Sequence, residues 1–154
     1  MSRLRRGPAR ETRLTRRVVA QLRVETAGAG FTDLTREVAA FLSEIAAGDG
    51  EVALFCRHTS ASLTIQENAD PDVRTDLLAA LDRLAPRDFG WVHTLEGPDD
   101  MPAHVKSVLT GVSVAVPVVD GRLALGTWQA IYLVEHRARP HHRDVVLAFT
   151  GDGR

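Results

Sequence analysis

The sequence predicts a single compact α+β domain in which helices pack on a mostly antiparallel, sandwich-like sheet. The chain has 154 residues, the usual length of one domain, and a chain of this length can bury a core without disulfides or a metal ion. Its apolar content of 44% and charged content of 25% are typical of globular proteins. Helical segments interrupt strands that are mostly joined as hairpins, a pattern that favours an antiparallel α+β sheet over a doubly wound one.

The N-terminal segment is a basic arm, with seven arginines and one acidic residue among the first seventeen residues. A basic segment can bind nucleic acid, but this one lacks the aromatic residues on which single-stranded bases stack. Because chain termini are often poorly ordered, we expect residues 1–17 to be a disordered arm and residues 18–154 to form the domain. We do not expect nucleic acid to be a partner.

The sequence contains neither of the apolar segments that direct a chain to a membrane. No apolar signal-peptide segment follows the arginines, and no run of eighteen apolar residues occurs anywhere. We therefore expect a soluble, cytoplasmic protein that makes no contact with a membrane.

The first predicted strand covers residues 18–24, which are rich in β-branched side chains and partly alternate between apolar and polar. A helix should follow, capped by Asp33 or Thr35 and running to about Ala47. Its apolar residues recur at i, i+3, i+4 and i+7, which places them on one face. The Gly-Asp-Gly segment 48–50 should end this helix.

Two strands are predicted next, at residues 51–56 and 60–66, because the first is a short apolar run and the second alternates. A helix should then begin at Asp70 and Pro71, since a capping side chain followed by proline at the first helical position is a favoured start. Its apolar residues form one stripe, and Pro86 should end it.

The second half of the chain is richer in strands. A short strand is predicted at residues 91–94 and a short helix from about 100 to 109, ended by Gly111. Asp120 and Gly121 are a favoured pair for a tight hairpin turn, and Pro117 inside a strand implies a sheet edge or a bulge. The remaining predicted strands cover residues 112–119, 123–125, 127–135 and 144–149.

The chain has one cysteine, Cys56, at the end of an apolar run. A single cysteine excludes an intramolecular disulfide framework and a CxxC motif, and in this position it should be a small buried hydrophobic residue. The alternative is a nucleophile, which would need a neighbouring base or cation to lower its pKa. Arg57 and His58, which follow directly, could fill that role.

The polar run after the predicted strand at 51–56 is a candidate binding segment. It contains Arg57, His58, Thr59 and Ser60. A guanidinium group beside hydroxyl groups suits an anion such as phosphate, because all of them donate hydrogen bonds to its oxygens. The alternative is a hairpin whose Ser and Thr side chains only satisfy the local backbone.

Two further segments carry polar residues at predicted strand ends. Asp70 is explained as a helix cap, but Glu67 and Asn68 are not, so they are candidates for binding. Gln129, in the segment Gly126-Thr127-Trp128-Gln129, and Arg137, in the segment Glu135-His136-Arg137, form another candidate cluster. For Gln129 the alternative is a structural role, in which the amide satisfies a neighbouring backbone group.

His93, Asp100 and His104 are candidate metal ligands. Asp100 and His104 are four residues apart and should share one face of the short helix. The two histidines could reach a common ion, with Asp100 either binding it or orienting a histidine. The spacing of the histidines is not a recognised zinc motif, so the alternative is two ordinary surface or core histidines. Lys106 and Ser107 of the same helix are candidate substrate ligands.

The sequence lacks the GxxxxGK[ST] and GxGxxG loops that bind nucleotide phosphates and the GxSxG turn of serine esterases. These absences argue against nucleotide hydrolases, dinucleotide oxidoreductases and ordinary serine esterases.

Three segments are similar to the YjbQ-type family: HTSASLTIQENADPDVRTDL (58–77), HTLEGPDDMPAHVKSVLTG (93–111) and SVAVPVVDGRLALGTWQAIYLVEHR (113–137). The resemblance covers about Val18 to Gly151, although the chain has Gln66 and Ala130 where family members often have Asn and Gly. The resemblance implies a homotrimer with the polar clusters near the subunit boundaries. It also implies weak thiamine-phosphate synthase activity, which joins a pyrimidine pyrophosphate to a thiazole phosphate and releases pyrophosphate.

The residues and the resemblance together lead to one ranked set of hypotheses. The first is a transferase acting on phosphorylated small molecules, the second a metal-binding protein or metal-dependent hydrolase, and the third a non-catalytic ligand-binding trimer with the arm as its contact. The expected catalytic residues are His58, Glu67, His93 and His104; the expected substrate ligands are Arg57, Thr59, Ser60, Asn68, Lys106, Ser107, Gln129 and Arg137. A divalent ion, Mg²⁺ or Zn²⁺, would be held by His93, Asp100 and His104.

Overall fold

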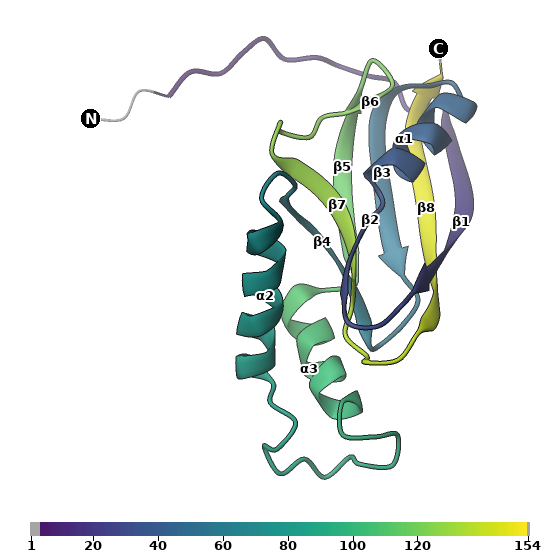
Figure 1. The fold of residues 1–154 in the computed structure, drawn as a ribbon. Coiled ribbons are helices and arrows are strands. Elements are labelled where there is room, and N and C mark those ends of the chain that lie inside the picture. The colour runs from purple at the N-terminus through teal and green to yellow at the C-terminus, as the bar shows by residue number, and fades with distance from the viewer. Residues whose placement is uncertain (1–3, 154) are drawn as a thin grey trace.

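The computed structural model describes residues 4–153, which form two antiparallel sheets and three helices (Figure 1). One sheet has the strand order β1-β8-β3-β5-β6 and the other the order β2-β7-β4. The antiparallel, two-sheet α+β architecture confirms the predicted fold class. The strands are β1 (Arg16–Thr26), β2 (Gly30–Asp33), β3 (Ala47–Cys56), β4 (Ala61–Glu67), β5 (Ser113–Val119), β6 (Arg122–Leu123), β7 (Gln129–Glu135) and β8 (His141–Gly153), and the helices are α1 (Thr35–Glu44), α2 (Pro71–Leu84) and α3 (Asp100–Thr110).

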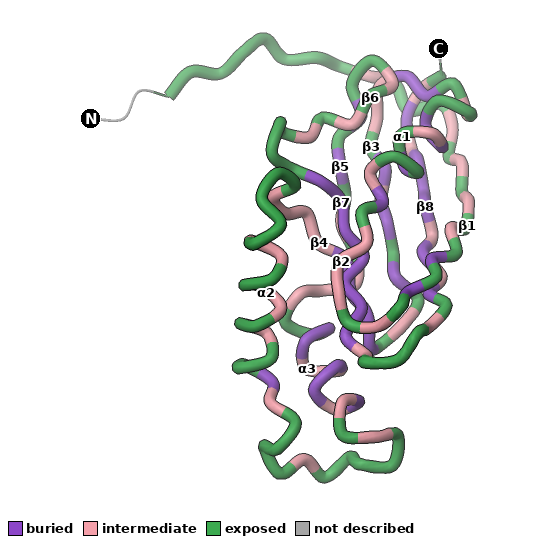
Figure 2. Tube along the Cα trace, viewed as in Figure 1, coloured by how far each residue is buried: buried purple, intermediate pink, exposed green. Residues whose placement is uncertain are grey.

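The core is built from buried residues of both sheets, which Figure 2 shows in purple along the strands. Val52 of β3 pairs with Phe149 of β8 on one side and with Val116 of β5 on the other. Leu133 of β7 is also fully buried in this core. Burying a side chain of this size stabilises the fold by about 1.5–3 kcal/mol relative to leaving it exposed.

The first helix is shorter than predicted. It begins at Thr35, whose backbone N–H donates to the Asp33 carboxylate at 2.8 Å, and it ends at Glu44 rather than near Ala47. The glycines expected to end it lie instead in β3. A Cβ atom on Gly50 would stand 2.3 Å from the Thr150 carbonyl oxygen, so this position needs glycine to let β3 and β8 approach.

The other two helices have the predicted starts and ends. Asp70 caps α2 by accepting a hydrogen bond from the Asp72 N–H at 2.9 Å, with proline at the first helical position. Gly111 ends α3 with a φ of +86°, a conformation that favours glycine. No helix within residues 4–153 is long and apolar enough to cross a membrane.

The strand predicted at residues 91–94 is wrong, because this segment is an irregular loop. The Trp91 indole donates to the Pro86 carbonyl at 2.8 Å and its ring lies 4.5 Å from that of Phe89. Val92 is fully exposed. Trp91, which had indicated a strand, therefore packs within its own loop. The structure also contains a short strand that was not predicted, β2, which pairs with β7.

The hairpin between β5 and β6 is confirmed. Asp120 and Gly121 have φ values of +50° and +70°, as a two-residue turn with both central residues left-handed requires. β6 pairs with Val118 and Val119 of β5, and Ala124, directly after β6, donates to the Pro117 carbonyl at 2.9 Å. Pro117 therefore lies beside the short edge strand, where its missing N–H costs little, as expected. β8 extends further at both ends than the predicted strand at residues 144–149.

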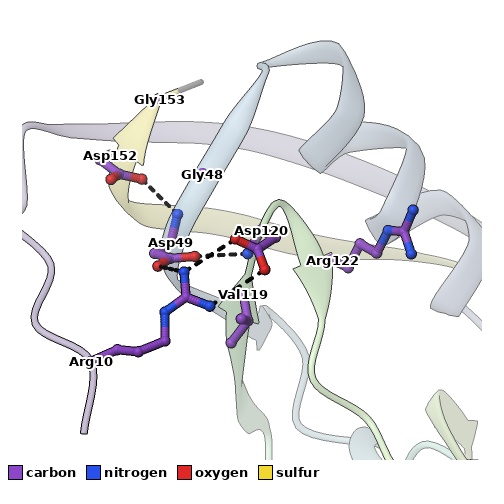
Figure 3. A pocket seen from close by; sticks show the side chains of 8 residues that line it. All are labelled: Arg10, Gly48, Asp49, Val119, Asp120, Arg122, Asp152 and Gly153. Atoms are coloured by element: carbon purple, nitrogen blue, oxygen red, sulfur yellow. Dashed lines mark hydrogen bonds and ion pairs between the residues drawn. The ribbon is translucent and has the colours of Figure 1, made fainter. Parts of the chain in front are cut away.

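The arm is held to the domain at Arg10. Its guanidinium lies 2.6 Å from the Asp49 carboxylate and 3.1 Å from that of Asp120, at the edge of a cavity of about 700 Å³ (Figure 3). Arg16 and Arg17, which were assigned to the arm, already belong to β1. Residues 1–3 of the predicted arm, and residue 154 of the predicted domain, lie outside the described residues.

Candidate metal centre and adjoining pocket

Three candidate ligands meet at one end of the molecule, as predicted. His93 comes from the loop before α3, and Asp100 and His104 come from adjacent turns of α3. Their ligand atoms all lie within 4.8 Å of one another. The Nε2 atoms of His93 and His104 lie 2.7 Å and 3.2 Å from Oδ2 of Asp100. Two histidines and one carboxylate are a ligand set that proteins use for zinc.

A backbone carbonyl fixes the orientation of His104. Its Nδ1 lies 2.8 Å from the carbonyl oxygen of Thr59, which can only accept a hydrogen bond, so Nδ1 carries a proton. The basic nitrogen, Nε2, therefore faces Asp100. This is the usual arrangement of a metal-binding histidine, whose second nitrogen donates to a carbonyl or carboxylate outside the coordination sphere.

Asp100 is almost fully buried, with 2% of its side chain exposed. Burial raises the pKa of Asp100, but the hydrogen bond from His93 and the charge of Arg137 outweigh it, so the pKa lies below the usual aspartate value. Oδ1 receives a hydrogen bond from Nη1 of Arg137, while Oδ2 faces both histidines. Asp100 therefore presents one oxygen of an ionised carboxylate to the cluster.

Arg137, an expected substrate ligand, is committed to holding the loop before α3. Besides Asp100, it donates from Nη2 to the Glu96 carbonyl at 2.7 Å and from Nε to the Asp99 carboxylate at 3.2 Å. Only 14% of its side chain is exposed. Burial raises the pKa of Asp99, but hydrogen bonds from the Ala138 backbone and Arg137 bring it below the usual value. The structure thus gives Arg137 a positioning role.

A buried ion pair behind the cluster was not predicted. Glu135 and Arg143 are both buried, and their side chains lie 2.5 Å apart. Glu135 also accepts from the Arg137 backbone N–H at 2.9 Å, and Arg143 donates to the Ser60 hydroxyl at 3.0 Å. The pair therefore connects Arg137, which holds Asp100, to the segment that carries the Thr59 carbonyl.

The sequence does contain a signal for this pair. Along β8, Arg143 has the same parity as Val145, Leu147 and Phe149, which all point into the core. A strand places alternate side chains on the same face. A charged residue on the inward face should be paired, so this alternation could have identified Arg143 as the partner of a buried acid.

A cavity of about 690 Å³ adjoins the cluster. It lies between the end of β3 with the segment after it and the last turns of α3, and His104 belongs both to its wall and to the metal cluster. The predicted polar run thus does border a cavity. Its lining residues are Phe55, Cys56, Arg57, His58, Thr59, His104, Ser107, Val108, Gly111 and Val112.

Within this cavity, His58 and Cys56 have clear structural partners. His58 Nε2 accepts from the backbone N–H of Asp144 at 2.7 Å, and burial, helped by the charge of Arg143, lowers the pKa of His58. Burial raises the pKa of the Cys56 thiol, and the residue is 1% exposed. The interpretation of Cys56 as a buried hydrophobic residue is therefore confirmed, and a thiol in this state is a poor nucleophile.

Three expected substrate ligands are used inside the fold. Ser60 is buried against Arg143, and the Ser107 hydroxyl donates to the Ala61 carbonyl at 3.0 Å. Lys106 is buried and pairs with Asp82, which joins α3 to α2. None of the three side chains has a partner in the histidine cluster within the part of the chain that the structure describes.

The remaining candidates, Glu67, Asn68 and Gln129, lie at the far end of the smaller sheet, so a single chain does not bring them beside the histidines. Glu67 pairs with Gln129, whereas Ala61, at the other end of β4, contacts Ser107 of α3. Six residue steps along a strand span roughly 20 Å. Glu67 accepts from the backbone N–H of Asp70, Asn68 donates to the Thr127 carbonyl, and Gln129 accepts from Gly126.

The fold and the cluster define a class of protein: a two-sheet α+β domain with a His–Asp–His group at one end. The chain belongs to the UPF0047 protein YjbQ-like family, whose model matches residues 20–152. This finding confirms the resemblance on which the expectations above were based.

Curated relatives cover most of the chain. The UPF0047 protein sll1880 of Synechocystis is 46% identical over 130 residues, which are 84% of this chain and 88% of that protein. The UPF0047 protein YjbQ of Salmonella typhimurium is 43% identical over 80% of this chain and 90% of its own length.

Solved structures have the same fold. The conserved hypothetical protein TT1486 from Thermus thermophilus is 43% identical, with a TM-score of 0.74 over 82% of this chain and 97% of that one. The hypothetical protein APE1520 from Aeropyrum pernix is 30% identical, with a TM-score of 0.81 over 88% of this chain and 99% of its own.

Proposed function

We propose that this protein is a zinc-dependent enzyme that acts on phosphorylated small molecules, with His93, Asp100 and His104 as the zinc ligands. One observation carries the proposal: the basic Nε2 of His104 points at the ionised Asp100 carboxylate from 3.2 Å. Two electron-pair donors at this distance need a proton or a cation between them. Imidazole nitrogens favour zinc, whereas Mg²⁺ prefers oxygen ligands, so of the two expected ions the ligand set favours zinc.

The protein residues have separable roles in this proposal. A zinc ion with three protein ligands retains an open position and can polarise a phosphoryl oxygen or activate water. Arg137 holds Asp100 ionised and oriented, and the Thr59 carbonyl directs His104. Arg57 is exposed and lines the cavity, and its guanidinium contacts no acceptor within residues 4–153, so it is available to bind a phosphate.

The reaction we propose first is the transfer expected from the family resemblance, in which a pyrimidine pyrophosphate joins a thiazole phosphate. Departure of pyrophosphate requires neutralisation of the developing negative charge, which a zinc ion beside Arg57 would supply. The alternative is a hydrolase that uses the same ion to activate water.

We propose that the protein acts as a homotrimer. The apolar side chains of Val92 and Leu95, on either side of His93 in the loop before α3, are exposed in the single chain, as expected of residues that a subunit interface covers.

Zinc binding is tested first, with protein that carries no histidine tag. We expect one zinc ion per chain, and His93→Ala or His104→Ala to weaken zinc binding at least about a hundredfold, because each removes one of three ligands. His142→Ala is the matched control, since His142 is exposed and outside the cluster. Isothermal titration with ZnCl₂ measures the affinity. Absence of a stoichiometric ion, or equal affinity in the variants and the control, would contradict the proposal.

Product analysis then separates the candidate reactions. The zinc-loaded protein is given the pyrimidine pyrophosphate with and without the thiazole phosphate. Release of pyrophosphate only when both are present supports the transferase, and phosphate release from either alone supports the hydrolase. Both variants should lose turnover while keeping the wild-type mass in solution. If the wild type turns over neither substrate, removal of residues 1–15, which leaves β1 complete, tests the third hypothesis, a non-catalytic protein that binds its partner through the arm.

A further inference from the structure

The cavity beside the candidate metal centre has the form of a small-molecule pocket. His104, Ser107 and Val108 follow the spacing i, i+3 and i+4, so they line one face of α3, and Gly111, directly after the helix, continues that wall. Residues 55–59 form the facing wall. A volume of about 690 Å³ lies within the range that small-molecule sites occupy.

The ring of His58 is fixed in this wall as one tautomer. The Asp144 backbone N–H donates to Nε2 at 2.7 Å, so Nε2 carries no proton. In a neutral imidazole the proton must then be on Nδ1. The Asp144 carbonyl accepts from the Arg57 N–H at 3.0 Å, so two hydrogen bonds hold this segment against β8. Burial also favours the neutral ring.

Within residues 4–153, the Nδ1–H group of His58 donates to no protein atom, and the side chain is only partly buried. It is therefore a donor open to a ligand. Phe55 and Val108, which line the same cavity, provide exposed apolar surface, and Arg57 adds a positive charge to the lining.

We propose that this pocket binds a small molecule with an apolar ring or chain and a hydrogen-bond acceptor, and that His58 recognises the acceptor as an Nδ1–H donor. The apolar part packs between Phe55 and Val108, and an anionic group lies toward His104 and Arg57. The position of the anionic group rests on the proposed zinc site; the apolar contact and the His58 hydrogen bond do not. His58 is in this account a specificity-determining donor, not the catalytic base.

The tautomer is tested directly by long-range ¹H–¹⁵N correlation spectra of the histidine rings at neutral pH, with His58→Gln identifying the signal. We expect a protonated Nδ1 and an unprotonated Nε2. A protonated Nε2, or a doubly protonated ring, would overturn the assignment of His58 as a neutral donor.

Binding is tested with phenyl phosphate and inorganic phosphate as probes, each titrated with and without zinc. Phenyl phosphate should bind at least about tenfold more tightly than phosphate, because its ring buries apolar surface. His58→Gln keeps an acceptor for the Asp144 N–H but has no donor at the position of Nδ1, because its amide NH2 lies elsewhere, and it should weaken phenyl phosphate binding about fivefold to tenfold.

Val108→Arg fills the pocket and should abolish the preference for phenyl phosphate. Leu109→Arg is the matched control, since Leu109 is the next residue of α3, is exposed, and does not line the pocket. Zinc affinity should be unchanged in His58→Gln, Val108→Arg and Leu109→Arg, so loss of zinc binding and loss of ligand binding in the pocket are separate outcomes. Equal affinity for the two probes, or a preference that survives Val108→Arg, would overturn the proposal. So would a loss of assembly in Val108→Arg without any change in probe binding, because the groove would then be covered by a second copy.

Discussion

At the scale of single residues, Arg137 determines the state of the candidate centre. Its guanidinium contacts Asp99, Asp100 and the Glu96 carbonyl while remaining largely buried. It thereby fixes both the charge on Asp100 and the position of the loop that carries His93. A residue with this many contacts cannot be replaced by another cation of different shape.

Arg137→Met should therefore lower both stability and zinc affinity. Breaking a buried ion pair leaves an uncompensated carboxylate and costs about 3–5 kcal/mol, and the freed loop should weaken zinc binding about tenfold or more. Urea unfolding and zinc titration measure the two effects. Arg137→Lys should restore part of the stability, and a variant that binds zinc as tightly as the wild type would contradict the assigned role.

His136 gives the fold a predictable pH dependence. It is buried and bonded to the Ser62 hydroxyl at 2.8 Å, and burial, with the charge of Lys106, lowers its pKa from 6.5 to about 4. The unfolded chain thus binds a proton at a higher pH than the folded protein does. The free energy of unfolding therefore has its full value, as far as His136 is concerned, above pH 6.5, and it decreases as the pH falls from 6.5 to about 4.

The loss over that interval should be about 3 kcal/mol, since each pKa unit corresponds to about 1.4 kcal/mol. Chemical unfolding at a series of pH values measures it. His136→Asn, which does not titrate, should show a correspondingly flatter profile between pH 6.5 and 4.5. Parallel profiles for the variant and the wild type would refute this explanation.

The residues of the metal cluster could be predicted because their chemistry is local. Asp100 and His104 are one helical turn apart, and that spacing alone puts them together. The role of His58 could not be predicted, because its partner is a backbone N–H eighty-six residues away. Arg143 was not predicted, although the alternation of apolar residues along β8 places it on the inward face of the strand.

At the scale of elements, Glu135 connects three strands. It accepts hydrogen bonds from Thr26 of β1 at 2.9 Å and from Arg143 of β8, while itself ending β7. Burial raises the pKa of Glu135, but these hydrogen bonds together with that from Arg137 lower it below the usual value. The carboxylate is thus ionised at the place where these strands approach the metal cluster.

Glu135→Gln should destabilise the protein by about 3–5 kcal/mol, because Arg143 is left buried without its counter-charge. Thr26→Val removes only one neutral hydrogen bond and should cost about 0.5–1.5 kcal/mol. Zinc affinity should fall in Glu135→Gln but not in the exposed control Glu25→Gln. Thermal unfolding measures the stability of the three variants, and zinc titration measures their affinity. Equal stability of Glu135→Gln and the control Glu25→Gln would contradict the assigned role of Glu135.

Most helices and strands followed from local patterns, and the exceptions have physical causes. α2 has a capping side chain, and α3 has a glycine that ends it, each within its own sequence. The segment 91–94 has strand-like residues but no partner strand, whereas β2 has no recognisable pattern and exists because β7 pairs with it. Pairing between distant segments is not encoded by the residues of either segment alone.

At the scale of the whole molecule, the sheet register separates what the sequence had grouped. Polar residues at both ends of β4 and β7 were assigned to one site, but antiparallel pairing places Ala61 beside Glu135 and Glu67 beside Gln129, at opposite ends of the sheet. Only the end near α3 carries the histidine cluster. The hypotheses that need a metal centre are therefore supported by this geometry, whereas a site that requires Glu67 or Gln129 beside the histidines is not.

The central claim, a zinc ion bound by His93, Asp100 and His104, is tested most directly by anomalous diffraction. Crystals of the untagged protein, grown with zinc, are measured on both sides of the zinc absorption edge. The account predicts one anomalous peak per chain at about 2.0–2.2 Å from Nε2 of both histidines and from Oδ2 of Asp100. No peak there, with Nε2 of His104 bonded directly to the Asp100 carboxylate, would contradict it and leave the cluster as a structural ion pair.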